Sequence, residues 1–230
     1  MYEDMKGLGT LVMVSLLLMF AGPGFTKEKV PKAGLNEALF EAVGRNDVAM
    51  VRQLLNQGAS IHAQDGKGQT ALLVAVDRNH VESAKVLIEA GADVNAQDRQ
   101  LDSPFLLAGA RGYLEIVKLT LEAKPDFAIY NRFGGTALIP ACERGHVETV
   151  RRLLQTDVDI NHVNRLGWTA LLEAIILSDG GPRHQEIVRL LIKAGADINL
   201  PDGDGISPLQ HARNKGFIPI AKMLESAGAR

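Results

Sequence analysis

Cysteine is nearly absent from this sequence, and the short motifs that mark common catalytic and cofactor sites are absent altogether. The single cysteine, Cys142, excludes an intrachain disulfide bond and a zinc site built from cysteines. The chain has no G-x-S-x-G elbow, no G-x-x-x-x-G-K-[ST] phosphate loop, no H-E-x-x-H zinc motif and no D-x-D-x-D-G calcium loop. We therefore expect no catalytic residue, no cofactor and no metal ion. An enzyme with an unrecognised site is the alternative.

An excess of charge of either sign is also lacking. The chain carries 25 lysines and arginines against 27 aspartates and glutamates, which gives a net charge of −2. This balance predicts no general attraction to nucleic acid or to an anionic membrane. Composition alone names no class of partner, and we expect a monomer or a one-to-one complex.

What the sequence does contain is a short triplet that recurs at a nearly constant interval. Ser or Thr, then Pro or Ala, then an apolar residue occur at Thr70–Leu72, Ser103–Phe105, Thr136–Leu138, Thr169–Leu171 and Ser207–Leu209. The steps between their first residues are 33, 33, 33 and 38. The segment "GADVNAQD" at 91–98 returns as "GADINLPD" at 195–202. A fixed period of this length predicts an array of stacked repeats.

One complete repeat, "DGKGQTALLVAVDRNHVESAKVLIEAGADVNAQ" at 65–97, resembles the ankyrin repeat. Thr70 is placed to cap a first helix, His80 precedes a second helix, and Gly91 supplies the left-handed residue that ends it. The resemblance implies an all-α ankyrin-repeat solenoid of about six stacked helix-turn-helix units with β-turn or hairpin tips. The expected units are 35–64, 65–97, 98–130, 131–163, 164–201 and 202–230, and the first of these is an N-terminal cap.

The segment before this array reads as an export signal. Residues 7–22 are almost wholly apolar, but the stretch is too short for an ordinary membrane span. We expect a signal peptide at 1–24, a linker at 25–34, and a start at Met5 rather than Met1, because "MKGLG" has the positive charge that such a signal needs. The expected location is a bacterial periplasm. The alternatives are secretion, an uncleaved N-terminal membrane anchor and a disordered tail.

Cys142 has the same repeat phase as Val76 and Gly109, on a helix face that should be buried. We expect inert packing there, with a reactive thiol as the alternative. A solitary cysteine suits an oxidising compartment.

Several positions depart from the repeat pattern. Leu101 stands where a turn glycine is expected, and Lys124 and Asp157 stand where the second helix should end at a glycine. Non-glycine residues in a left-handed conformation cost roughly 1 kcal/mol each, so the middle units should be less stable. The "SDGGP" segment at 178–182 adds five residues, which predicts a projecting loop.

In ankyrin arrays the binding surface is usually the row of turn tips together with the exposed ends of the first helices. The resemblance therefore implies a protein-binding face here, rich in the residue types found at binding hot spots. Its expected residues are Arg78, Arg99, Arg111, Tyr130, Arg132, Phe133, Arg144, Arg165, Leu166, Trp168 and Ile206. Arg99, Arg132 and Arg165 form one series at steps of 33, and Arg78, Arg111 and Arg144 form another. An alternative is that both series are remnants of repeat duplication and that the aromatic side chains pack on neighbouring loops.

Such a face predicts a partly acidic partner surface with an apolar pocket. The resemblance to exported bacterial ankyrin proteins implies an accessory or protective partner of an enzyme or toxin. The alternative is a secreted effector that engages host proteins.

Overall fold

The computed structural model describes residues 32–230, so the predicted signal peptide and most of the predicted linker lie outside the described residues. The described part contains twelve helices. The first helices of the pairs are α1 (Lys32–Gly44), α3 (Ala71–Asp77), α5 (Pro104–Arg111), α7 (Leu138–Glu143), α9 (Ala170–Ile176) and α11 (Pro208–Asn214). The second helices are α2 (Val48–Asn56), α4 (Val81–Glu89), α6 (Leu114–Glu122), α8 (Val147–Leu153), α10 (Pro182–Lys193) and α12 (Ile218–Ser226).

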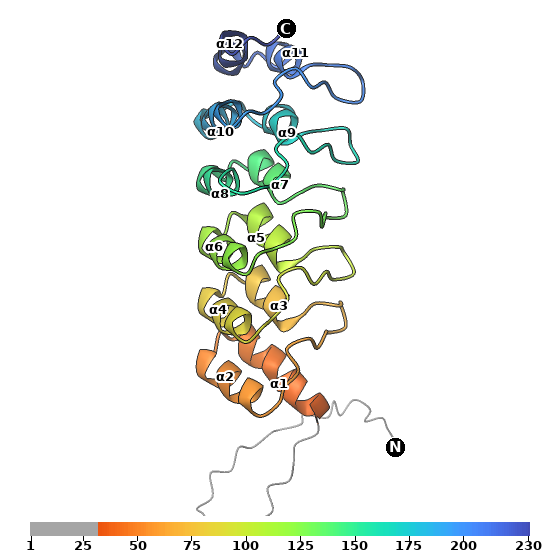
Figure 1. Ribbon diagram of the computed structural model, residues 1–230, viewed down its shortest axis with the longest axis vertical. Coiled ribbons are helices and arrows are strands. Elements are labelled where there is room, and N and C mark those ends of the chain that lie inside the picture. Colours follow the sequence, from red (N-terminus) through yellow and green to blue (C-terminus); the bar gives the residue numbers. More distant parts are fainter. Residues whose placement is uncertain (1–31) are drawn as a thin grey trace, which may run out of the picture. The chain divides into compact units, whose positions relative to one another are not determined.

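The twelve helices form six stacked pairs (Figure 1). The odd-numbered helices make one row, the even-numbered helices make the other, and each pair packs on the next. The predicted all-α ankyrin solenoid is thus confirmed. The tips are turns, because residues 32–230 contain no strand and only one isolated β-bridge, between Gln64 and Thr70. Within the same range no helix is long and apolar enough to cross a membrane.

The recurring Ser or Thr starts most of the first helices, as the sequence predicts. The side chain of Thr70 accepts a hydrogen bond from the backbone N–H of Leu73 at 3.2 Å. Ser103, Thr169 and Ser207 make the equivalent bond, and each satisfies a backbone N–H that has no partner within the helix.

Helix α7 is the exception, since Thr136 caps nothing. The backbone N–H of Val74 bonds to the Thr70 carbonyl at 3.0 Å, but Pro140 occupies that position in α7 and has no N–H to donate. The helix begins at Leu138, and the buried hydroxyl of Thr136 has no hydrogen-bond partner among the described residues.

The repeated eight-residue segment ends one unit and joins it to the next. Gly91 takes a φ of 90°, and the Asp93 side chain accepts the N–H of Asn95 at 2.8 Å. The Asn95 side chain in turn accepts the N–H of Asp126, in the following unit, at 3.0 Å. In the second copy, Asn199 accepts the N–H of Arg230 in the same way. The segment therefore recurs because its residues end the second helix and connect one unit to the next.

Two of the three predicted left-handed residues are found. Leu101 has a φ of 60° and Lys124 a φ of 56°. The expectation for Asp157 is wrong, because α8 ends early at Leu153 and Asp157 has no positive φ. The Thr156 hydroxyl donates to the Leu153 carbonyl at 2.6 Å, and this turn replaces the left-handed helix ending.

The inserted loop packs against its neighbours more closely than the sequence predicts. Gly180 is buried with a φ of 66°, and a Cβ atom there would lie 2.5 Å from the Phe217 ring of the next unit. His184 is also buried and bonds to the Glu143 carbonyl at 2.9 Å. The insertion joins three units and does not project freely.

The core runs between the two rows of helices through all six pairs. Leu72, Leu138, Leu171 and Leu191 are among its fully buried side chains. Cys142 is 0% exposed, as its phase predicts, and burial raises the pKa of its thiol well above the usual value. A neutral, enclosed thiol is a packing group.

Candidate protein-binding groove

Each tip turn is built around one Asp or Asn side chain. The Asn164 side-chain oxygen accepts the N–H groups of Leu166 at 2.9 Å and Trp168 at 3.1 Å, which closes the turn. The residues that do this are Asp65, Asp98, Asn131, Asn164 and Asp202. Our sequence reasoning missed them, although their steps of 33, 33, 33 and 38 match the triplet. They fix the backbone of these five tip turns.

A groove of about 890 Å³ lies between these tips and the exposed ends of the first helices. We call it the tip groove. Six of the predicted binding residues line it: Arg99, Arg111, Arg132, Phe133, Arg144 and Leu166. The other five, which do not line it, are Arg78, Tyr130, Arg165, Trp168 and Ile206.

Three exposed apolar side chains line the tip groove, two on tip turns and one at the end of α9. Phe133 is 50% exposed, Leu166 is 52% exposed, and Leu177, just after α9, is 47% exposed. Apolar groups with this much exposure inside a concave surface are typical of binding sites.

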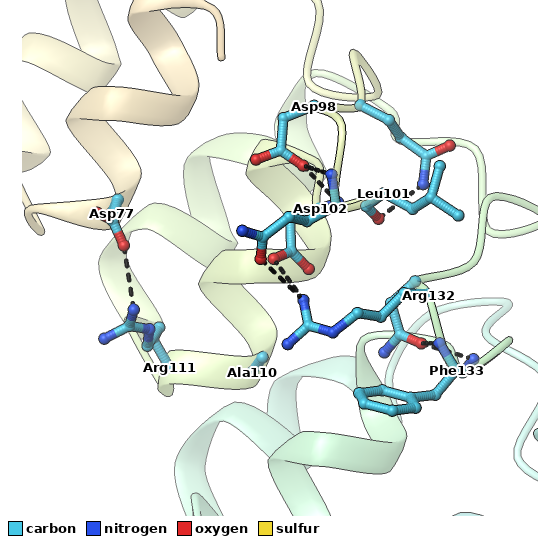
Figure 2. A network of polar contacts seen from close by, with 12 residues as sticks. Asp77, Asp98, Leu101, Asp102, Ala110, Arg111, Arg132 and Phe133 are labelled. Carbon is cyan, nitrogen blue, oxygen red and sulfur yellow. Dashed lines mark hydrogen bonds and ion pairs between the residues drawn. The ribbon is translucent and has the colours of Figure 1, made fainter. Parts of the chain in front are cut away.

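Two of the helix-end arginines cap the preceding repeat. Arg78 donates to the Gly44 carbonyl at 2.5 Å, and Arg144 donates to the Ala110 carbonyl at 2.8 Å. These carbonyls lie at the end of a first helix, where a cationic side chain is favourable. Arg111 differs, since it forms an ion pair with Asp77 at 3.0 Å (Figure 2). Stacking of the repeats thus explains much of this series.

The tip arginines are also partly occupied within the chain. Arg132 pairs with Asp102 at 3.2 Å and lies 5.1 Å from the centre of the Phe133 ring, and Figure 2 shows its side chain extended toward Asp102. Burial raises the pKa of Asp102, and the charge of Arg132 opposes that shift. Arg165 donates to the Arg132 carbonyl at 3.0 Å. These contacts within the chain occupy arginine side chains that, from the sequence alone, are predicted to contact an acidic surface of a partner.

The remaining predicted residues lie at the sides of the tips. Tyr130 stacks on His162 with ring centres 4.3 Å apart and remains 39% exposed. Trp168 and Ile206 are half-buried. Packing on neighbouring loops, the alternative given for the aromatic residues, therefore describes Tyr130.

The groove also holds a buried carboxyl group that sequence reasoning missed. Glu173 on α9 lines the tip groove and is 5% exposed. Asn164 donates to its Oε1 atom at 2.7 Å. Burial, and then the nearby negative charge of Glu143, raise the pKa of Glu173 to about 7. The signal was visible, because Glu173 has the repeat phase of Val74, Leu107 and Pro140, which are apolar, and among the five units with a tip turn only the last carries another titratable residue there, His211.

No arrangement for metal chemistry is found in the described part of the chain. No three His, Cys, Asp or Glu side chains in residues 32–230 are grouped so that they could hold a metal ion.

The fold and the groove define a repeat protein of a known class. The sequence profile described as "Ankyrin repeats (3 copies)" matches residues 7–98 and 105–202, and that described as "Ankyrin repeats (many copies)" matches residues 182–225. The chain therefore belongs to the ankyrin-repeat family. The first match begins inside the segment predicted to be an export signal.

Known proteins of this family are similar over most of the described chain. An ankyrin repeat domain from Acinetobacter baumannii AYE is 56% identical, with a TM-score of 0.82, over 84% of this chain and 98% of that one. The ankyrin repeat protein EF0377 is 41% identical, with a TM-score of 0.80, over 83% and 97%. The ankyrin repeat domain of Bcl-3, a member of the IkappaB protein family, is 27% identical, with a TM-score of 0.77, over 84% and 86%.

One curated relative matches a shorter stretch. The ankyrin repeat protein YahD of Escherichia coli K12 is 51% identical over 57 residues, which is 25% of this chain and 28% of YahD. The match thus spans little more than a quarter of that protein. Ankyrin repeats mediate protein–protein binding, and they are generally interaction modules rather than enzymes.

Proposed function

We propose that this protein binds one partner protein in the tip groove. The observation that carries the proposal is the exposure of Phe133, Leu166 and Leu177 together inside that groove. Large apolar side chains held on rigid turns lose little entropy when they bind, so they are suited to be the centre of an interface. The charged residues around them then form the rim.

The proposal is tested by affinity capture from an extract of the source organism, with the purified protein as bait. The double variant Phe133→Ala and Leu166→Ala should recover the partner at least roughly tenfold less efficiently, as expected when hot-spot side chains are truncated. Val163→Ala is the control, since Val163 is exposed and apolar but does not line the groove. Equal recovery by the double variant would place the binding face elsewhere.

We further propose that the protein works outside the cytoplasm, as an accessory or protective partner of an enzyme or toxin. The support is the apolar segment at 7–22 and the presence of a single cysteine. Sequencing the N-terminus of the native protein should give a first residue near Phe25. An intact Met1 or Met5 in a cytoplasmic fraction would overturn the location, and recovery from the culture medium would favour a secreted effector.

A further inference from the structure

We propose that the tip groove receives a lysine or arginine side chain of the partner, with its cationic head at Glu173 and its aliphatic stem against Leu177 and Leu166. The proposal rests on the proposed protein-binding function and adds the chemistry of the residue that is recognised.

The position of Glu173 is the first argument. Glu173 lines the groove although the residue is 95% buried, and Asn164 is the one hydrogen-bond donor to its carboxyl group among residues 32–230. The Oε2 atom has no donor within that range. A buried carboxylate without a cation is costly, so a cation brought by a partner would be strongly favoured.

The apolar surroundings are the second argument. Leu177 follows Glu173 by one helical turn, and its N–H bonds to the Glu173 carbonyl at 3.1 Å. Leu166 follows Asn164 by two residues on the tip turn that holds the Glu173 carboxyl. A carboxyl group with apolar neighbours matches the long apolar stem and charged end of lysine or arginine.

The local charge is the third argument. From α7, Glu143 adds negative charge near Glu173, whereas the positive charge of Arg144 has a smaller effect and its guanidinium donates to the Ala110 carbonyl. Cys142 of α7 is a buried neutral thiol, and His211 of α11 pairs with Asp202 at 2.7 Å. Arg111 and Arg132 are paired with Asp77 and Asp102. The part of the groove between α7 and α9 therefore attracts a cation, whereas the sequence alone predicts an acidic partner.

The test is selection of binders from a phage-displayed library of random linear peptides on the purified protein at pH 8. We expect the selected peptides to carry Lys or Arg next to apolar residues. Their affinity, measured by fluorescence polarisation, should fall by roughly tenfold or more in Glu173→Gln. It should also fall between pH 8 and pH 6 in the parent but not in Glu173→Gln, because the carboxyl group becomes protonated. Circular dichroism confirms that the variant is folded, and Glu143→Gln should cause a smaller loss.

The outcomes separate this inference from the proposed function. Peptides without a basic residue that depend on Phe133 and Leu166 would overturn the inference and leave the groove as the binding site. Basic peptides that bind Glu173→Gln as well as the parent would also overturn it. Peptides that are unaffected by Phe133→Ala with Leu166→Ala would contradict the groove itself.

Discussion

At Lys124 a single residue shows how the array tolerates an unfavourable backbone. The lysine takes a left-handed φ of 56° at the end of the second helix, where Gly91 and Gly195 occupy the same place in their own units. A side chain in this conformation costs roughly 1 kcal/mol, and glycine does not incur that cost.

We therefore expect Lys124→Gly to raise the free energy of unfolding by about 0.5–1 kcal/mol. Asp157→Gly is the matched control, since Asp157 has the same repeat phase but no positive φ. Glycine should lower stability there, because it increases the conformational entropy of the unfolded chain and relieves no backbone strain in the folded chain. Urea denaturation of the two variants checks this, and an equal gain in both would contradict the backbone explanation.

Glu173 should make stability depend on pH. Its pKa is about 7 in the folded chain, above the ordinary value of 4.5, so the unfolded chain loses this proton first as the pH rises. The contribution of the neutral carboxyl group to stability is complete below about pH 4.5 and is lost as the pH rises to about 7.

Glu173→Gln should remove this dependence. The free energy of unfolding of the variant, relative to the parent, should increase between pH 5 and pH 8 by at most about 3 kcal/mol, at roughly 1.4 kcal/mol per pKa unit. Urea denaturation at the two pH values measures it. A constant difference between variant and parent would show that the folded pKa is not raised.

Among the helices, α7 differs most from its neighbours, because Pro140 prevents the first hydrogen bond and the Thr136 hydroxyl has no partner within residues 32–230. The four other first helices that follow a tip turn are capped by their Ser or Thr. The same residue type in the same phase thus has different energetic roles.

Thr136→Val and Thr169→Val form a pair that tests this difference. Thr169→Val should lower the free energy of unfolding by about 1 kcal/mol, because the cap of α9 is lost. Thr136→Val should change it by less than about 0.5 kcal/mol or raise it, since a buried hydroxyl without a partner is removed. Thermal unfolding followed by circular dichroism compares them, and similar losses in both would show that Thr136 caps α7.

Across the whole array, stability depends on the contacts between neighbouring units. Asn95 and Asn161 each accept a backbone N–H of the following unit, from Asp126 at 3.0 Å and from Asp197 at 2.8 Å. Ala128 has the same repeat phase but no side-chain acceptor, so this connection is missing between the two middle units.

We expect Ala128→Asn to raise the free energy of unfolding by about 0.5–1 kcal/mol, the net value of one hydrogen bond, and Asn161→Ala to lower it by a similar amount.

In the parent protein, amide hydrogen exchange should be faster around Lys124 and Asp157 than around Gly91. Exchange in Ala128→Asn should slow in the middle units. Uniform protection in the parent would contradict a weak centre.

The sequence by itself determined the repeat, and through it the fold. The Ser or Thr of every triplet except Thr136, and the glycines at 91 and 195, act on the backbone within a few residues, so their spacing predicts where most of the helices begin and end. Lys124 and Leu101 were predicted in the left-handed region for the same reason. The placement of Phe133 and Leu166 in the tips followed from the period, and the structure puts both in one groove.

Only the tertiary structure decided which of these side chains are available to bind a partner. Arg78 and Arg144 bind carbonyls 34 residues earlier in the chain, Arg132 pairs with Asp102, and the inserted loop packs on Phe217. Asp157 avoids the left-handed region because α8 ends two residues earlier than α4 and α6 do in their units. Glu173 became a candidate binding group because it is buried and accepts a hydrogen bond from Asn164 of the tip turn in its own unit. The arginine contacts and the packing of the inserted loop depend on neighbouring units, and a local pattern in the sequence does not contain the distances that govern those contacts.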